Sequence, residues 1–251
     1  MPPALSQRLA VRERPPGRPV MKQRWSRLLF LHWRVAPELL TPLLPPGLHL
    51  DFHKDAAWLG LVPFFMERIR PTYLPAVPWL SWFLELNVRI YVHDEKGAPG
   101  VWFLSLDCNQ PVAVTLARDL FLLPYQHARM RSGGTFAATT YHCQRHGAEG
   151  DAIYHYGPAS EQLQVAEPGS LEFFLLERYL LFSRGRDGGL FSGQVHHSPY
   201  RWSPGACERW STLPIKWDGL PEPATPPDSI LWSESVDVDV FPIRRLTAPP
   251  P

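Results

Sequence analysis

Proline limits the fold of this chain more than any other residue type. The sequence has 29 prolines in 251 residues, and they are scattered along the chain rather than gathered in one segment. Because proline breaks helix interiors but fits turns, strand ends and sheet edges, this distribution disfavours a bundle of long helices. Hydrophobic residues make up 45% of the chain, which is typical of a globular protein with a packed core. We therefore expect a protein built mainly of strands and turns.

The clearest strand covers residues 83–92 (FLELNVRIYV). Its even-numbered positions are all aliphatic, whereas its odd-numbered positions hold Phe83, Glu85, Asn87, Arg89 and Tyr91. Side chains alternate between the two faces of a strand, so one face is apolar and the other carries a polar row between two aromatic rings. A Gly/Pro-rich turn leads to a second strand over residues 101–107, which completes a hairpin. Further strands are expected over residues 24–35, 58–68, 134–144, 152–157, 190–197 and 229–243.

The predicted helices are few and short. Apolar residues at helical spacing predict a helix over residues 112–122, and another over residues 37–44 ends at two prolines. A third is expected over residues 170–182, with Ser170 as its N-cap. The fold class is therefore mainly β with a few flanking helices, and the sheet is expected to be mostly antiparallel.

The sequence indicates one domain with two unstructured ends. Residues 1–20 are rich in arginine and proline and show no apolar periodicity, which is typical of a disordered arm. A different kind of sequence begins at Met21, so a mis-assigned start codon, with Met21 as the true first residue, is an alternative for this arm. No repeat or long linker divides residues 21–246. Residues 247–251 form a short proline-rich tail, which we expect to be disordered.

Charge and cysteine content argue against several classes of partner. The 25 lysines and arginines nearly balance the 24 acidic residues, and a net charge of +1 gives no electrostatic reason to bind nucleic acid or an anionic membrane. No apolar stretch reaches the ~20 residues of a spanning helix, and no export signal is recognised. Three dispersed cysteines do not make a disulfide framework. We expect a cytoplasmic protein with no cofactor, since no glycine-rich phosphate loop precedes a helix.

The histidines and cysteines suggest a metal site only weakly. His142, Cys143 and His146 lie close together in sequence, and His196 and His197 form a pair. On a strand, His142 and His146 share a face but lie too far apart to bind a metal alone, and neither H-E-x-x-H nor C-x-x-C occurs. We therefore expect no metal, although ligands converging from distant segments would change this.

The polar row of residues 83–92 has two interpretations. It is either the solvated face of an antiparallel sheet or the interior wall of a barrel. In a barrel interior each of the polar groups needs a partner, and the row becomes a ligand site.

Several blocks of the sequence then point to a known family. In chain order they are FLELNVRIYV, PGVWFLSLD, ARDLFLLPY, SLEFFLLERY and HHSPYRW. Together they resemble the YqjF-like family of uncharacterised bacterial proteins, over nearly the whole chain from about residue 21. The resemblance implies the fold of the acetoacetate decarboxylase-like superfamily, an antiparallel β-cone or barrel that encloses a cavity and is flanked by a few helices.

Decarboxylases of that superfamily use a Schiff-base lysine in a Gly-Phe-Pro-Lys-Lys block after a helix that contains Gly-Arg-Glu. The matching stretch here is Ala117-Arg118-Asp119 followed by Leu122-Leu123-Pro124-Tyr125-Gln126, so Tyr125 and Gln126 stand where the lysines are expected. None of the remaining lysines restores the motif, and we expect no decarboxylation through a lysine iminium. These lysines are Lys22, Lys54, Lys96 and Lys216.

Glu85 resembles the pocket glutamate of the superfamily, and it heads our set of candidate catalytic residues. In an apolar cavity its pKa would rise, so it could act as a general acid or base. Arg118 could hold a carboxylate or form a structural pair with Glu85, and Tyr125 could donate a hydrogen bond or simply pack. The candidate ligand-binding residues are Phe83, Asn87, Arg89, Tyr91, Ser105 and Arg178.

Three functions remain open at this point. The first is a small-molecule-binding protein whose cavity takes a small organic acid or carbonyl compound. The second is a lysine-independent acid/base enzyme of hydratase, isomerase or lyase type that uses the same pocket. The third is a structural or interaction protein whose interior is filled by its own side chains. Superfamily members often assemble, so the resemblance also implies a possible homo-oligomer.

Overall fold

The computed structural model describes residues 2–246, except for the side chains of residues 116 and 117, and the expected tail at 247–251 lies outside the described residues. The fold is mainly β with short flanking helices, which confirms the predicted class. The strands are β1 (Met21–Val35), β2 (Leu48–Leu50), β3 (Ala57–Pro71), β4 (Phe83–Asp94), β5 (Pro99–Cys108), β6 (Tyr125–Gly134), β7 (Thr139–Arg145), β8 (Ala152–Pro158), β9 (Gln164–Val165), β10 (Leu180–Arg184), β11 (Leu190–His196), β12 (Arg201–Arg209), β13 (Ser229–Val240) and β14 (Arg244–Arg245). The helices are α1 (Leu5–Ala10), α2 (Pro37–Leu40), η1 (Thr41–Leu43), α3 (Pro111–Leu120), α4 (Leu171–Leu176) and α5 (Leu213–Trp217).

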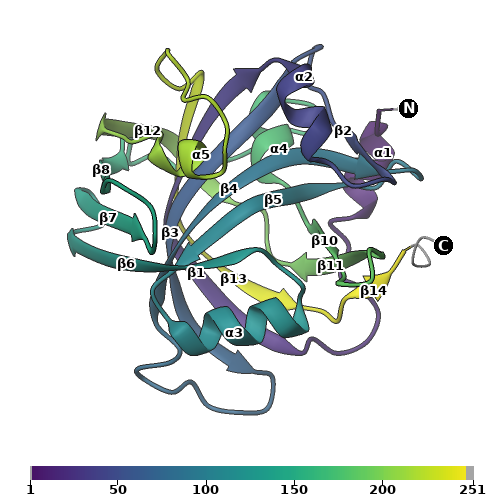
Figure 1. Cartoon of the computed structure of the whole chain (residues 1–251), viewed down its shortest axis with the longest axis horizontal. Coiled ribbons are helices and arrows are strands. Elements are labelled where there is room, and N and C mark those ends of the chain that lie inside the picture. Colours follow the sequence, from purple (N-terminus) through teal and green to yellow (C-terminus); the bar gives the residue numbers. More distant parts are fainter. Residues whose placement is uncertain (1, 247–251) are drawn as a thin grey trace.

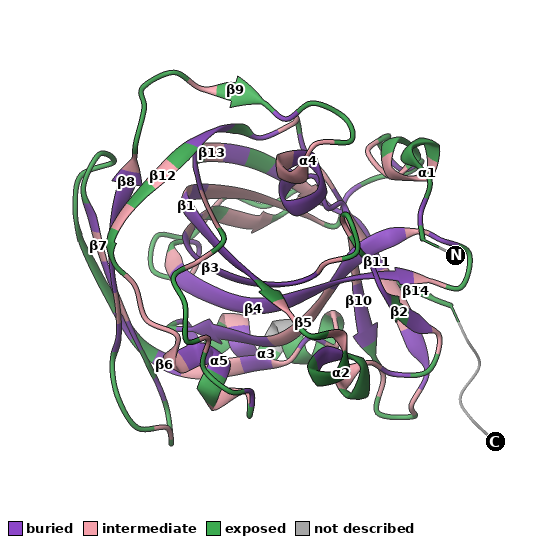
Figure 2. Cartoon of the chain, turned by 90° about the horizontal axis from the view of Figure 1, so that it is seen from above, coloured by how far each residue is buried: buried purple, intermediate pink, exposed green. Residues whose placement is uncertain are grey.

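The sheet curls into a cone-like ring, which is visible end-on in Figure 2. Strands β13, β1, β3, β4 and β5 pair in that order, and β10 and β11 carry the sheet from β5 back to β13, where Val195 pairs with Val240. We call these seven strands the cavity ring. Strands β6, β7, β8 and β12 make a second connection from β5 to β13 on the opposite side, and we call this the core side. Most of these pairings are antiparallel.

The central strand β4 is buried on both faces. Its even-numbered residues, from Leu84 to Val92, pack on the core side against aromatic residues such as Tyr141 and Tyr154. Its odd-numbered residues from Phe83 to Arg89 face the interior of the cavity ring. The alternation in the sequence is therefore explained by two different interiors, one filled and one hollow.

Two predicted elements have different bounds in the structure. The N-cap of α4 is as predicted, because the Ser170 hydroxyl accepts a hydrogen bond from the Phe173 amide at 3.1 Å. The helix nevertheless ends at Leu176 rather than at residue 182, since the chain turns to pair as β10 with β5 and β11. The strand predicted over residues 134–144 corresponds to β7, which begins only at Thr139, because Gly134, at positive φ, ends the preceding strand at a turn. The long strands β6 and β12 were not predicted.

The N-terminal arm also differs from the expectation. Residues 1–20 were expected to be disordered, but the described part of this arm, residues 2–20, contains α1 and lies against the domain (Figure 1). Arg8 forms two hydrogen bonds with the fully buried Asp51, at 2.6 and 2.7 Å, and Arg12 and Arg14 lie over the rings of Phe173 and Phe241. The sequence could not show this, because the partners of these arginines lie far away in the chain. Within the described residues, no helix is long and apolar enough to cross a membrane.

A buried ionic network ties the core side to β5. Arg145 of β7 donates to Asp107 of β5 at 2.7 Å, and to Asp218, just after α5, at 2.7 Å. Its remaining nitrogen donates to the Ser105 hydroxyl at 2.6 Å, and Asp107 is completely buried. Removal of the cation would leave a buried carboxylate without compensation.

We therefore predict that Arg145→Ala lowers the free energy of unfolding by about 3–5 kcal/mol. Arg186→Ala is a matched control, because Arg186 is exposed and its pair with Asp119 is worth about 1 kcal/mol or less. Urea unfolding followed by circular dichroism measures both variants. Equal losses in the two would contradict the assigned role of the network.

Candidate functional site

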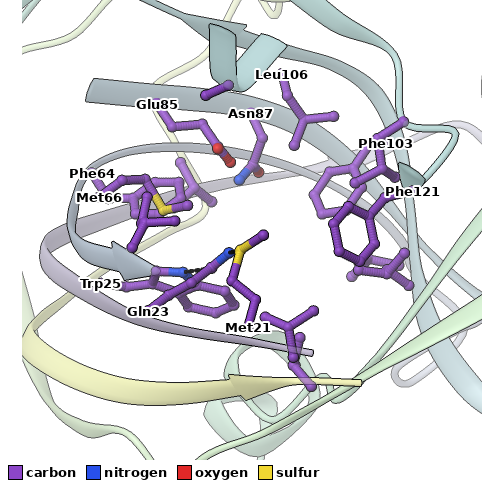
Figure 3. Close-up of a pocket in the computed structure, with 18 of the residues that line it drawn as sticks. Met21, Gln23, Trp25, Phe64, Met66, Glu85, Asn87, Phe103, Leu106 and Phe121 are labelled. Atoms are coloured by element: carbon purple, nitrogen blue, oxygen red, sulfur yellow. Dashed lines mark hydrogen bonds between the residues drawn. The ribbon is translucent and has the colours of Figure 1, made fainter. Parts of the chain in front are cut away.

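A cavity of about 440 Å³ lies inside the cavity ring. Every strand of the ring contributes lining residues, and α3, α4 and the start of β6 add others. Most of the lining side chains are apolar, and Figure 3 shows Trp25, Phe64, Met66, Phe103 and Phe121 arranged around the space. An interior of this kind is typical of small-molecule sites, in which a few polar groups fix the orientation of a ligand.

The polar groups come chiefly from β4. Glu85, Asn87 and Arg89 line the cavity from every second position, as the alternation of the strand requires. Their neighbours across the sheet on β3 are Phe64, Val62 and Gly60. A Cβ atom on Gly60 would lie 3.2 Å from both Arg89 Cγ and the Tyr91 hydroxyl, so glycine leaves the space that the arginine occupies.

Glu85 is a buried acid with hydrogen-bond donors beside it. The Tyr125 hydroxyl donates to Glu85 Oε2 at 2.7 Å, and Asn87 also forms a side-chain hydrogen bond with this carboxyl group. Burial raises the pKa of Glu85 to about 7, although these two hydrogen bonds oppose the shift. Burial and the nearby Glu85 hold the pKa of Tyr125 well above its usual value, so the phenol stays a donor. Asn87 Oδ1 is buried and has no hydrogen-bond partner among the described residues.

Arg89 is a buried cation on the cavity wall. Its Nε and Nη2 donate to the Tyr91 hydroxyl at 3.3 and 3.1 Å, and Nη2 also donates to the Leu175 carbonyl at 3.2 Å. In the described part of the chain, no carboxylate pairs with it and no group accepts from Nη1. Burial and Arg89 lower the pKa of the adjacent His32 well below its usual value, so this histidine is neutral.

Arg178 also lines the cavity, but its charge is compensated. Its Nη1 donates to Asp51 at 2.7 Å and its Nε donates to the Phe174 carbonyl at 2.7 Å. Asp51 binds Arg8 of the N-terminal arm as well, so two cations share one buried carboxylate. Arg178 Nη2 has no partner among the described residues.

Three candidates from the sequence lie away from the cavity surface. Arg118 is exposed, and its Nε donates to the Tyr125 backbone carbonyl at 2.7 Å, so it neither faces the cavity nor pairs with Glu85. Ser105 faces the core side, because Leu106 and not Ser105 has its side chain in the cavity, and it belongs to the Arg145 network. Tyr91 lies behind Arg89 and holds it through its hydroxyl. Phe83 does line the cavity.

The histidine–cysteine cluster does not converge. Cys143 is fully buried on the core side, whereas the neighbouring His142 points the other way and lies 3.1 Å from Asp151. No group of three or more His, Cys, Asp or Glu residues suited to a metal ion occurs in the part of the chain that the structure describes.

Sequence analysis missed the lining residues of β1. Gln23 and Trp25 face the cavity from odd-numbered positions, but Leu28 and Phe30 face it from even-numbered ones. An irregularity in the pairing of β1 with β3, with Arg27 at positive φ, shifts the phase of the strand between them. The apolar run that follows conceals this shift, so no simple alternation could have identified the face.

The lysines lie outside the cavity. All four are within the described residues, and none is among the lining residues. Tyr125, at the position where the resemblance places a lysine, instead contacts Glu85.

Comparison with known proteins gives a sequence family. Residues 22–237 match the model of DUF2071, described as an uncharacterized conserved protein. The chain is also similar to the uncharacterized protein YqjF of Bacillus subtilis (strain 168), with 35% identity over 233 residues. This match covers 92% of the chain and 94% of YqjF.

Solved structures confirm the expected fold. Acetoacetate decarboxylase from Legionella pneumophila subsp. pneumophila str. Philadelphia 1 superposes with a TM-score of 0.62 at 14% identity, covering 92% of this chain and 88% of that one. The enduracididine biosynthesis enzyme MppR, complexed with pyruvate, gives 0.64 at 15%, covering 94% and 93%. An acetoacetate decarboxylase-like enzyme from Sphingomonas wittichii RW1 gives 0.62 at 13%, covering 92% and 95%. The chain is thus a cavity-bearing protein with an acetoacetate decarboxylase-like fold.

The raised pKa of Glu85 predicts a pH-dependent stability. Between pH 4.5 and about 7 the folded protein holds a proton on Glu85 that the unfolded chain has already released. The free energy of unfolding must therefore fall as the pH rises through this window, by about 3 kcal/mol from this group. Glu85→Gln should abolish this component, and the exposed Glu95→Gln should retain it. Urea unfolding at pH 5 and pH 8 measures the difference, and an unchanged slope in Glu85→Gln would contradict the assignment.

Proposed function

This chain belongs to the DUF2071 family, and we propose that it binds a small organic acid or carbonyl compound in its cavity, with the ligand carboxylate on Arg89. The observation that carries this proposal is the position of Arg89, a buried cation without a paired carboxylate among the described residues. Buried charges in proteins are usually paired, because desolvation of an isolated ion is expensive. A carboxylate from a ligand would supply the missing charge and accept from the guanidinium.

The surroundings of Arg89 support this role. The Tyr91 hydroxyl and the Leu175 carbonyl fix the guanidinium without neutralising it. On the same strand, Asn87 Oδ1 could accept a hydrogen bond from a hydroxyl group of the ligand, and the Glu85 carboxyl group, when protonated, could donate to a ligand carbonyl. An open cavity also disfavours a purely structural protein with a filled interior.

Two further observations restrict the chemistry. The structural neighbour MppR was solved with pyruvate, which is a small keto acid of the proposed class. No lysine of this chain lines the cavity, so we do not expect an iminium intermediate or decarboxylation through one.

Arg89→Met is predicted to weaken the binding of small carboxylates by about 30-fold or more, because a buried charge on the ligand would lose its partner. The free energy of unfolding of the empty protein should not fall, since the substitution removes an uncompensated charge and keeps most of the side-chain volume. Isothermal titration calorimetry with pyruvate and butanoate, together with urea unfolding, measures both quantities.

Arg129→Gln serves as the control, because Arg129 is exposed on β6 and outside the cavity. Native mass spectrometry of the freshly purified protein adds a search for the natural ligand. Carboxylates that bind Arg89→Met as tightly as the wild type would refute the proposal.

A second candidate function is acid/base catalysis by Glu85. A carboxyl group with a pKa of about 7 can both take and return a proton near neutrality. As a base, Glu85 would remove the proton from the carbon beside a ligand carbonyl while the C–H electron pair moves towards the carbonyl oxygen. Return of a proton to the same carbon regenerates the carboxylate.

This function predicts exchange of that hydrogen for deuterium when a keto acid is incubated with the protein in D₂O. Proton NMR would follow the loss of signal, and the rate should rise with pH through about 7 as Glu85 ionises. Glu85→Gln should abolish exchange but keep binding, whereas Glu95→Gln should change neither. If the wild-type protein binds the keto acid but does not exchange its hydrogen, the protein has a binding function only and this catalytic function is excluded.

A further inference from the structure

We propose that the acid bound by this cavity carries an apolar tail, with its carboxylate at the closed end on Arg89 and its tail directed to the mouth beside α3. This inference rests on the proposed function and adds the class of ligand and its direction. It follows from the order of side chains along the cavity, from the unequal exposure of its two ends, and from its volume.

The lining along β4 is polar at three successive cavity-facing positions and becomes apolar at the last one. Arg89 lies at one end, followed by Asn87, Glu85 and finally Phe83. Phe83 pairs across the sheet with Met66, which in turn pairs with Trp25, so the lining at this level is apolar. Six residues of strand span about 20 Å, so the two ends are far apart on the scale of a short keto acid.

The Arg89 end is closed and the Phe83 end is open. Arg89 contacts the Leu175 carbonyl of α4, and the Tyr200 and Arg178 side chains that complete this end are buried. At the other end the lining includes Leu120 of α3, which is 57% exposed. Figure 1 shows α3 and the loop of residues 72–82 together on one side of the molecule, and Leu80 of that loop also lines the mouth.

The polar side chains near the mouth already have partners. Gln23 Oε1 accepts from the Trp25 indole nitrogen at 2.9 Å. Arg70 is only half-buried, and its Nη1 lies 3.4 Å from the Arg68 carbonyl oxygen. Arg70 is thus more accessible to water, which compensates its charge, than Arg89, which is only 9% exposed.

The volume of the cavity also favours a longer ligand. A space of about 440 Å³ is within the range of sites for drug-sized molecules, and a three-carbon acid at Arg89 would leave most of the apolar wall without contacts. A tail that displaces water from this wall gains affinity with each buried methylene, by about fourfold. Methionine side chains, such as Met66 in Figure 3, adapt to ligands of different shape.

The test is a calorimetric titration of the full-length protein with straight-chain carboxylates from acetate to decanoate, below their micelle concentrations. Affinity should rise by about fourfold per methylene and then level off as the tail reaches the mouth. Decanol, which lacks the carboxylate, should bind at least tenfold more weakly than decanoate. Arg89→Met should remove this advantage, and Arg70→Gln, which changes the arginine at the other end, should keep it.

A second set of variants tests the tail directly. Ala113 of α3 lines the outer part of the cavity, so Ala113→Phe should shorten the chain length at which affinity levels off and leave butanoate unchanged. Ala206→Phe adds the same side chain to an exposed position on β12 and should have no effect. If Ala113→Phe does not fold, Phe121→Trp tests the same space.

The outcomes separate this inference from the proposed function. If acetate and decanoate bind equally well and both depend on Arg89, the proposed function stands and the apolar tail is refuted. If acetate depends on Arg89 but decanoate depends on Arg70, the proposed function stands for short acids and the direction of the apolar tail is refuted. If no carboxylate binds, or all bind regardless of Arg89, the proposed function itself fails.

Discussion

The architecture depends on a strand that is buried on both faces but is apolar on only one of them. The even-numbered side chains of β4 pack into a filled core, and its odd-numbered side chains must find polar partners in the opposite interior. For Glu85 these partners are Tyr125 and Asn87, and for Arg89 they are neutral oxygen atoms. Desolvation of both ionisable groups is the constraint from which the chemistry of the cavity follows.

Two buried arginines of this interior illustrate how differently a fold can treat the same side chain. Arg178 is balanced by Asp51, which lies on the short segment after β2 and also holds the N-terminal arm through Arg8. Arg89 receives hydrogen-bond acceptors but no opposite charge from the described residues. The first arrangement is what a structural ion pair requires, and the second leaves the charge available to a bound anion.

Much of the fold and part of the site could be predicted from the sequence. The period-two pattern of residues 83–92 identified β4 and its polar row because a regular strand preserves the phase of its side chains. The same logic failed on β1, where the irregularity near Arg27 reverses the phase within an apolar run. Arg118 was a candidate because it matches a motif, but a motif does not determine where a side chain points. The Arg118 side chain donates to the Tyr125 backbone carbonyl instead of entering the cavity. The early end of α4 likewise depends on pairing with β5, a distant contact that local sequence does not encode.

An uncompensated charge in the interior also affects the protein when the cavity is empty. Burial of the Arg89 charge lowers the margin of stability of the empty protein, which is its free energy of unfolding. A bound anion restores that margin by mass action. Chains with a smaller margin unfold more often and are removed sooner by cellular proteases. The lifetime of this protein, and hence its amount, would then follow the supply of its ligand, so that abundance alone would report whether the compound is present.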